Sequence, residues 1–306
     1  MYNRVIVAEK ITKVYPNGVR ANAEVSLEVC SGETACIMGP NGAGKTTLVR
    51  QIMGLLKPTS GRITVLGFNP AERQEVIRRS VAYVPQQPLV FPAHRVIEVV
   101  RYVADLAGTP HTRVQEVLEL LGLWDFRDRL GYQLSAGQRK LLLLAQALVK
   151  NSELMILDEP TSYIDVLKKR TVWDVLAYEK KKGKTLLLVS HDLEEVKRLC
   201  DRVYLMLYGR VVDVLSSLDS LHTWAEVKII SRFAGKLSQL FTRGDVNVGE
   251  NIVVVKYKKL VDALQELEQL VINGEYRDDI RVYLEYPSIE TILTKAVTSR
   301  GVMHGS

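Results

Sequence analysis

The stretch Gly39-Pro40-Asn41-Gly42-Ala43-Gly44-Lys45-Thr46 decides the fold, because it matches the phosphate-binding pattern G-x-x-x-x-G-K-[ST]. A strand-length apolar run, Thr34–Met38, precedes it, and a helix-compatible stretch, residues 45–53, overlaps its end. In this setting the glycines let backbone N–H groups surround a phosphate, Lys45 reaches the β- and γ-phosphates, and the Thr46 hydroxyl ligates Mg²⁺. The sequence therefore predicts that the residues from Gly39 to Thr47 bind a nucleoside triphosphate.

A dinucleotide-binding fold also places a glycine-rich turn between a strand and a helix. That fold requires an acidic residue about 20 positions further on, and residues 57–71 contain none. It also gives no role to Lys45 and Thr46. A chance glycine turn does not account for the complete spacing between a strand and a helix.

Two carboxylates, Asp158 and Glu159, follow directly after the apolar run of residues 154–157. Such a run is typical of a buried parallel strand, so both acids are expected at its carboxyl end, beside the phosphate loop. Asp158 is predicted to join the Mg²⁺ shell, and Glu159 to polarise the attacking water. Alone, such a pair is weak evidence, since acids often cap helices. Together with the phosphate loop, it is strong evidence for hydrolysis.

In the order of its motifs, the chain resembles the ATP-binding cassette (ABC) ATPases over residues 15–191. Leu134-Ser135-Ala136-Gly137-Gln138 resembles the family signature L-S-G-G-Q and stands before the second carboxylate strand, as in the family. The other matching positions are Tyr15 for the aromatic that stacks on adenine, Gln86 for the Q-loop, Asp165 (in Ser162-Tyr163-Ile164-Asp165) for the D-loop and His191 for the switch histidine. Each alone could be an ordinary surface or loop residue, but these five in the correct order, together with the phosphate loop and the carboxylate pair, make coincidence negligible.

The resemblance implies an Mg²⁺-dependent ATPase that works as a dimer. Its catalytic groups would be Lys45, Gln86, Glu159 and His191, and its metal ligands Thr46, Gln86 and Asp158. In the family, two cassettes enclose two ATP molecules, so the signature of one copy faces the phosphate loop of the other. The residues that would contact ATP across the dimer, where a helix start offers a second anion site, are Ser135, Ala136, Gly137, Gln138 and Asp165.

The chain departs from the family pattern at three places. Ala136 replaces the first glycine of the signature, which alanine tolerates if its φ is negative. Tyr163-Ile164-Asp165-Val166 replaces the common G-L-D-P and keeps only the aspartate, so contacts across the dimer are expected to differ. The second glycine usual after Tyr208-Gly209-Arg210 is absent. None of these changes removes a catalytic group.

The composition is that of a folded protein in a reducing compartment. Of the 306 residues, 47% are hydrophobic and 25% are charged, which excludes wholesale disorder. Cys30, Cys36 and Cys200 form no C-x-x-C pair, so neither a disulfide scaffold nor a thiolate zinc site is expected. The N-terminus lacks the apolar block of a signal peptide, and no apolar stretch is long enough to span a bilayer. We therefore expect a soluble, cytoplasmic protein.

Length and patterning predict two domains. Residues 1–220 alternate buried-strand patterns (34–38, 80–84, 154–157, 185–189) with helical ones (95–106, 113–121, 136–150). This is typical of an α/β fold. The resemblance specifies a P-loop NTPase (RecA-like) core with an antiparallel β subdomain and a helical insert over about residues 87–153. A polar, small-residue stretch at 216–220 marks the boundary.

Residues 221–306 predict a small α+β domain, to which we assign an accessory or regulatory role because it shows no catalytic motif. Its expected strands are 226–231, 252–255 and 280–285, and its expected helices are 233–241, 260–272 and 288–297. It carries 11 basic and 11 acidic side chains, so the whole net charge of +6 falls on residues 1–220. Such an excess suits nucleic acid, a membrane face, phosphorylated ligands or a solvated surface, and does not decide the function.

The resemblance also implies partners. These are a second copy or a paralogous cassette, and separate integral membrane transporter subunits at the cytoplasmic face of the membrane; no nucleic acid is expected. Residues 87–95 and 96–106 are the expected membrane-subunit docking surface, although part of that segment must also form the core of the helical insert. Stand-alone exporter cassettes of drugs, lipids or polysaccharides match best, and an importer cassette or a non-transport ATPase remain the alternatives.

Overall fold

The structure is a computed structural model that describes residues 4–215, 225–231, 233–257, 266 and 281–285. Contacts divide the chain into two compact units, Met1–Leu218 and Asp219–Ser306. Each unit is described by itself.

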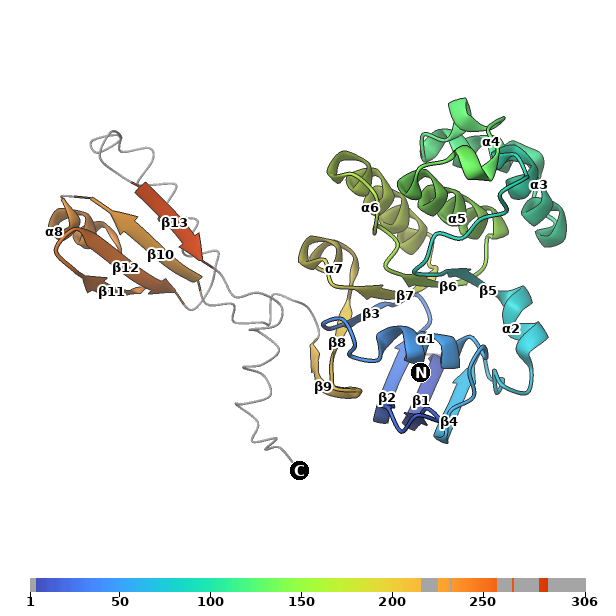
Figure 1. Ribbon diagram of the computed structural model, residues 1–306, viewed down its shortest axis with the longest axis horizontal. Helices are drawn as coiled ribbons and strands as arrows, with labels where there is room; N and C mark the ends of the chain where they lie inside the picture. The colour runs from blue at the N-terminus through green and yellow to red at the C-terminus, as the bar shows by residue number, and fades with distance from the viewer. Residues whose placement is uncertain (1–3, 216–224, 232, 258–265, 267–280, 286–306) are drawn as a thin grey trace. The chain divides into compact units, whose positions relative to one another are not determined.

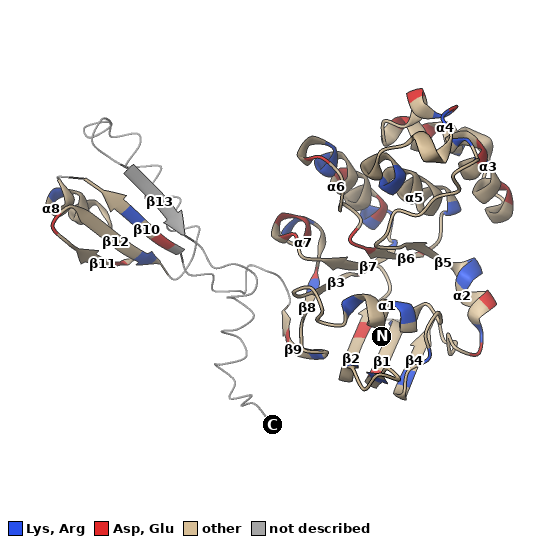
Figure 2. Ribbon diagram, in the orientation of Figure 1, with Lys and Arg blue, Asp and Glu red and all other residues tan. Residues whose placement is uncertain are grey.

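A six-stranded sheet forms the centre of the first unit (Figure 1). Its order is β5-β6-β7-β3-β8-β9, with parallel pairing except for β9, which is antiparallel to β8. The strands β3, β5 and β7 contain no charged residue (Figure 2), as expected where helices cover both faces. The bounds are β3 Thr34–Met38, β5 Val81–Val84, β6 Leu154–Asp158, β7 Thr185–Ser190, β8 Arg202–Leu207 and β9 Arg210–Leu215. The four strands expected from the sequence are all present.

The two faces of this sheet contribute to two separate cores, because side chains alternate along each strand. On β6, Leu154 and Ile156 pack with helix α1 and with a second, antiparallel sheet of order β2-β1-β4. Met155 and Leu157 pack against the helices of the opposite face. Figure 1 shows α1 between the two sheets. The bounds are β1 Arg4–Val14, β2 Arg20–Cys30, β4 Ser60–Val65 and α1 Lys45–Ile52.

Helices α3 to α6 cover the opposite face of the sheet (Figure 1). Their bounds are α3 Val96–Ala107, α4 His111–Leu120, α5 Ala136–Lys150 and α6 Val166–Lys181, with the short helices α2 Gln74–Ser80, α7 Leu193–Leu199, η1 Trp124–Phe126 and η2 Gly131–Gln133 elsewhere in the unit. Helices α3, α4 and α5 lie where the sequence predicted helices, whereas α6 was not predicted. Among the helices in the described ranges, none has both the length and the apolar character needed to cross a membrane.

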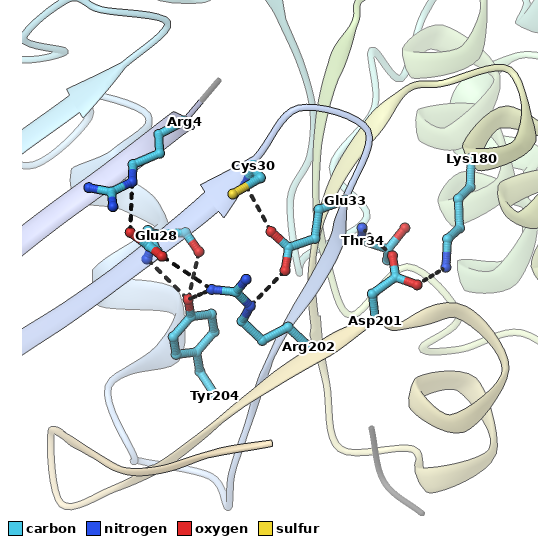
Figure 3. Close-up of polar contacts among 9 residues, drawn as sticks. All are labelled: Arg4, Glu28, Cys30, Glu33, Thr34, Lys180, Asp201, Arg202 and Tyr204. Carbon is cyan, nitrogen blue, oxygen red and sulfur yellow. Dashed lines mark hydrogen bonds and ion pairs between the residues drawn. The ribbon is translucent and has the colours of Figure 1, made fainter. Parts of the chain in front are cut away.

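A polar cluster joins β8 to the edge of the antiparallel sheet (Figure 3). The Arg202 guanidinium lies between two carboxylates, 2.8 Å from Glu33 Oε1 and 3.4 Å from Glu28 Oε1. The Tyr204 hydroxyl donates to the Glu28 carbonyl at 2.6 Å. The hydroxyl of Tyr204 and the two carboxylates hold the pKa of Arg202 above its usual range. This arrangement fixes the end of β2 against β3 and β8.

The second unit contains a four-stranded antiparallel sheet of order β11-β12-β10-β13. Its apolar core includes Val227, Ile229, Val253, Val255 and Leu237. The bounds are β10 Ala225–Ile230, α8 Ala234–Leu237, η4 Ser238–Leu240, β11 Asp245–Val248, β12 Ile252–Tyr257 and β13 Arg281–Glu285. The sequence analysis missed β11. The helices expected at 260–272 and 288–297 lie outside the described residues, apart from Glu266.

Candidate active site

The loop between β3 and α1 has the backbone of an anion site. Gly44 precedes the helix with a φ of 94°, and a Cβ atom there would lie 2.1 Å from the Ala21 carbonyl oxygen, so only glycine fits. No side chain caps the first turn of α1, and the turn contains no acidic residue. Its N–H groups and the positive end of the helix are therefore available to a negatively charged ligand.

Lys45 is a buried cation held only by neutral groups within hydrogen-bond distance. Its Nζ donates to the carbonyl oxygens of Gly39 and Pro40, both at 2.8 Å. Burial lowers the pKa of Lys45, and the nearby carboxylates Glu159 and Asp158 oppose that change. Exchanging two carbonyl contacts for phosphate oxygens would give this cation a much stronger partner.

Two buried side-chain amides, those of Asn22 and Gln51, form a hydrogen-bonded chain that ends on the backbone of the loop. Asn22 Nδ2 donates to the Gly44 carbonyl at 3.2 Å, and Gln51 Nε2 donates to Asn22 Oδ1 at 2.7 Å. Both residues are at most 1% exposed. The sequence analysis did not identify them, although a polar residue at an inward position of a strand, such as Asn22, was a usable signal.

Asp158 ends β6 as a fully buried carboxylate, and neither of its oxygens has a hydrogen-bond partner of standard geometry. Burial raises its pKa, and the neighbouring Thr46 hydroxyl opposes that rise. An unpartnered carboxylate beside a hydroxyl is a pair of hard oxygen donors, which fits Mg²⁺. Within the described ranges no group of three or more His, Cys, Asp or Glu residues is arranged so that it could hold a metal ion. These two residues would therefore leave most of the metal's coordination to phosphate oxygens and water.

Glu159 follows with a φ of 48°, a left-handed conformation that is strained for a residue other than glycine. Its N–H donates to the Val189 carbonyl at 2.9 Å, which holds the turn against the end of β7. His191, just beyond β7, has its Nδ1 3.4 Å from Glu159 Oε1. The strain thus places a carboxylate and an imidazole together, and such strain is concentrated at functional sites.

A cavity of about 370 Å³ brings several of the predicted residues together. Its lining consists of Asn41, Gly42, Ala43, Gly44, Lys45, Thr46, Thr47, Gln86 and Glu159, together with Val19, Arg20 and Ala21, which the sequence analysis missed. Tyr15 is connected to this lining because its hydroxyl lies 3.3 Å from Thr47 Oγ1. His191 and Asp158 adjoin the cavity through Glu159 and Thr46 without lining it.

The signature residues do not line the cavity of their own chain. Ser135 and Gln138 form a reciprocal cap at the start of α5: Ser135 Oγ accepts from the Gln138 N–H at 3.2 Å, and Gln138 Oε1 accepts from the Ser135 N–H at 3.0 Å. Ala136 is the first residue of the helix and has a negative φ, so alanine fits there. A Cβ atom on Gly137 would lie 2.7 Å from the Tyr163 carbonyl oxygen, which ties this turn to the segment before α6.

Asp165 also lies outside the cavity. It caps α6, and its carboxylate accepts a hydrogen bond from the Lys168 N–H at 2.9 Å. Together, the structure brings the phosphate loop, Gln86, Asp158, Glu159 and His191 to one edge of the sheet. It leaves Asp165 and the signature on a neighbouring surface.

One further residue of the site was not predicted. Lys140, on α5, is fully buried, and its Nζ donates to the carbonyls of Pro85 at 2.7 Å, Gln86 at 3.1 Å and Asp158 at 3.0 Å. Burial lowers its pKa to about 8, against the opposing effect of Asp158 and other nearby carboxylates. No spacing in the sequence marks this lysine, because its contacts lie 18 to 55 positions away.

Comparison with known proteins identifies the same region. The family model described as ABC transporter matches residues 23–162. Over 275 residues the chain is 30% identical to the Nod factor export ATP-binding protein I of Rhizobium sp. (strain N33). This alignment covers 89% of this chain and 90% of the relative. Over 221 residues it is 36% identical to the methionine import ATP-binding protein MetN of Geobacillus kaustophilus (strain HTA426), covering 68% of this chain and 65% of the relative.

A solved structure of an ATP-binding cassette has the same fold as the first unit. A dimeric ATP-binding cassette in a post-hydrolysis state, bound to ADP and Pi, superposes with a TM-score of 0.63 and 25% identity. The match covers 69% of this chain and 98% of the cassette. The phosphate loop, the buried carboxylate pair and the match over 90% of the Nod factor export relative all indicate the same family. The chain therefore belongs to the ATP-binding subunits of the ABC transporter family, which bind and hydrolyse ATP.

Proposed function

We propose that this cassette hydrolyses Mg²⁺-bound ATP to drive export through separate membrane subunits. The observation that carries the hydrolytic site is the buried, unpartnered Asp158 carboxylate beside Thr46, at the edge of a cavity lined by Lys45 and Glu159. Export is supported by the relative named for Nod factor export, whose match extends over 89% of this chain. The relative named for methionine import matches 68% of it and leaves import as the second candidate.

The geometry supports a division of roles among the site residues. The N–H groups of the loop and the Lys45 ammonium bind the β- and γ-phosphates. Thr46 and Asp158 would hold Mg²⁺, with Gln86 in the lining of the same cavity, and the bound metal would offset the phosphate charge. Glu159 accepts a proton from the water that attacks the γ-phosphorus, while the bond to the β–γ bridging oxygen breaks. His191, 3.4 Å from Glu159, orients that carboxylate and the departing phosphate.

A second cassette completes the site in this proposal. Ser135 and Gly137 lie at the start of α5, outside the cavity of their own chain, so they are free to approach the nucleotide of another copy. The positive end of α5 would then face the γ-phosphate. The dimeric ADP- and Pi-bound cassette supports this arrangement by analogy. Asp165 and Tyr15 would contribute at the dimer surface and at the adenine, respectively.

The segment after Gln86 is the proposed membrane-subunit surface. Residues 87–95 and helix α3 expose large apolar side chains, with Leu89 76% and Leu106 72% exposed, and Phe91 and Tyr102 each 61% exposed. Other side chains of α3, such as Val96 and Val100, lie in the core, so only one face of the helix is available. This surface supports docking at the cytoplasmic face of the membrane.

The direction of transport is tested with the membrane subunits that assemble with this chain. The complex is reconstituted in vesicles with the cassettes outside, and labelled candidate substrates are followed after ATP addition. Export predicts ATP-dependent accumulation inside the vesicles, because the cassette side corresponds to the cytoplasm. ATP-dependent loss of preloaded substrate would instead establish import.

The second unit is proposed to regulate or stabilise the dimer without taking part in the chemistry. The chain shortened to end at Ser220 should fold and bind ATP, with altered dimerisation or altered coupling to the membrane subunits. Nucleotide binding by equilibrium titration, alongside circular dichroism, tests this. A folded chain of residues 1–220 that no longer binds ATP would refute the proposed division.

A further inference from the structure

Lys140 bridges the ends of two neighbouring strands at a point where their own pairing stops. The ladder between β5 and β6 reaches Val84 and Leu157. The next residue after β5 is Pro85, which has no N–H with which to continue it. The Lys140 ammonium donates to the carbonyls of Pro85 and Gln86 on one side and of Asp158 on the other.

This arrangement uses the full donor capacity of the side chain. An ammonium group has three hydrogens, and Lys140 Nζ has three carbonyl acceptors between 2.7 and 3.1 Å. Burying a cation is unfavourable unless hydrogen bonds or opposite charges compensate for the lost hydration. An apolar residue at this position would avoid that cost, so a fully buried lysine needs a reason other than packing.

The three acceptors belong to the segments that carry the proposed chemistry. Gln86 lines the nucleotide cavity, Asp158 holds the unpartnered carboxylate, and Glu159 is the next residue in the chain. Lys140 itself lies on α5, whose first turn contains Ser135 and Gly137. Any shift of α5 relative to the sheet would therefore pull on the backbone carbonyls of Gln86 and Asp158 through Lys140.

We propose that Lys140 is a positioning residue for hydrolysis, which fixes the backbone of Gln86 and Asp158 to α5 and so couples the placement of the signature helix to that of the Glu159 carboxylate. The inference rests on the roles proposed above for Gln86, Asp158 and Glu159. Lys140 touches neither the nucleotide cavity nor a carboxylate oxygen within hydrogen-bond distance, so it acts through these residues.

The same helix supplies a matched control. Lys150, at the last turn of α5, also donates from Nζ to backbone carbonyls, those of Arg78 and Val81, and burial lowers its pKa as well. Its contacts lie in α2 (Arg78) and at the first residue of β5 (Val81), at the opposite end of that strand from Gln86. Lys150→Met therefore removes the same kind of interaction without touching the site.

The experiment compares Lys140→Met, Lys140→Arg and Lys150→Met in the full-length chain. It measures kcat and KM for ATP hydrolysis, the Kd for ATP by equilibrium titration, and the melting temperature. Lys140→Met should lower kcat by at least about tenfold, because small displacements of catalytic groups cost up to about 10²-fold. Its Kd for ATP should stay within about threefold, since the phosphate loop is unchanged. Lys150→Met should keep kcat within about twofold, even if its melting temperature falls.

Rescue separates positioning from bulk stability. Lys140→Arg restores a cation with several donors and should recover most of the lost kcat. A wild-type kcat in Lys140→Met overturns the inference, as does an equal loss of kcat in Lys150→Met at an equal loss of melting temperature. If Lys140→Met does not fold, Lys140→Gln replaces it: lowered kcat with unchanged Kd supports the inference, and wild-type kcat refutes it.

One further variant separates the Lys140 proposal from the proposal that this cavity binds and hydrolyses ATP. Lys45→Ala is measured in the same series. If Lys45→Ala hydrolyses ATP at the wild-type rate, the proposed site is wrong whatever the Lys140 variants do. If Lys45→Ala is inactive and Lys140→Met is fully active, only the positioning role is refuted.

Discussion

Two buried carboxylates, one in each unit, have opposite surroundings. Asp158 is fully buried at the end of β6, and neither oxygen accepts a hydrogen bond of standard geometry. Glu266, 5% exposed in the second unit, accepts hydrogen bonds from the Thr242 N–H and hydroxyl, the Arg243 N–H and the Tyr257 hydroxyl, all between 2.9 and 3.0 Å. The first carboxylate is left available to a ligand, and the second is fully used in holding a loop to a strand.

The pKa values of Asp158 and Glu266 shift in opposite directions because only Glu266 accepts enough hydrogen bonds to outweigh the effect of burial. Burial raises the pKa of Asp158, and the Thr46 hydroxyl only partly offsets it. Burial acts upward on Glu266 as well, but the hydrogen bonds from Thr242, Tyr257 and Arg243 outweigh it and lower its pKa. Since buried polar groups are normally hydrogen-bonded, an unpartnered one is the better marker of a ligand site than burial or charge alone.

The largest effect is expected from Lys45→Ala. It removes the buried cation at the loop, so the β- and γ-phosphates lose their fixed positive partner. Steady-state hydrolysis should be abolished, and ATP binding should weaken. Phosphate release and equilibrium ATP titration measure the two effects, with Lys150→Met as the control. Hydrolysis near the wild-type rate would show that Lys45 and its loop do not bind the nucleotide phosphates.

Glu159→Gln should come next, with a loss of about 10²–10⁴-fold in hydrolysis and preserved ATP binding. The change keeps the side chain's size and leaves Asp158 in place, but it removes the charge that deprotonates water. Because the γ-phosphate then persists, the variant should accumulate as an ATP-dependent dimer on size exclusion. Adding Ser135→Arg should block that dimer through bulk at the contact between copies.

Two results would contradict this mechanism in different ways. A Glu159→Gln chain that stays monomeric with ATP, both alone and with its membrane subunits, would exclude the enclosed dimer. Unchanged hydrolysis in the same variant would reject Glu159 as the base and transfer that role to His191, its neighbour at 3.4 Å.

Glu266→Gln should destabilise the second unit while leaving hydrolysis unchanged. The amide cannot replace a carboxylate that accepts four hydrogen bonds, and the expected loss is about 1–3 kcal/mol in the free energy of unfolding. Chemical denaturation measures the loss, and Glu250→Gln, at an exposed position of the same unit, is the control. A large fall in kcat at full folding would show that Glu266 contributes to the chemistry and that the contrast with Asp158 is wrong.

Asp158→Asn should have the opposite effect on stability. It neutralises a buried charge whose oxygens have no partner, so the melting temperature without nucleotide should equal or exceed that of the wild type. Hydrolysis should nevertheless be lost, because an amide is a poor Mg²⁺ ligand in place of a carboxylate. Differential scanning calorimetry with and without ATP and Mg²⁺ tests this. A clear drop in melting temperature would mean that Asp158 has a structural partner.

The smallest effect concerns acid stability. The pKa of Glu266 in the folded protein lies below its ordinary value of 4.5, so its contribution is complete above that pH. The contribution is lost as the pH falls through 4.5 towards the folded pKa. Glu266→Gln should therefore flatten the pH dependence of unfolding below about pH 4.5. Urea titrations from pH 3 to 6 provide the check, and an unchanged slope would rule out this linkage.

The sequence predicted the elements whose signals are local. The run Thr34–Met38 and the glycines after it specify a strand, a turn and a helix start within a dozen residues, and the structure contains each of them. The acids after residues 154–157 were placed correctly because four apolar residues define where a buried strand ends. By contrast, the apolar periodicity of α6 is weak, and β11 is a mostly exposed strand of only four residues; both were missed.

The sequence by itself determined the family, the phosphate loop and the carboxylate pair, because each depends on neighbouring residues that share one backbone conformation. Only the tertiary structure decided which polar groups remain unpartnered and which are joined across the chain. Asp158 is available because, in the folded site, neither of its oxygens accepts a hydrogen bond of standard geometry. Lys140 belongs to the site because packing brings carbonyls 18, 54 and 55 positions away around one ammonium group. No local pattern encodes such contacts, since they arise only when the helix docks on the sheet.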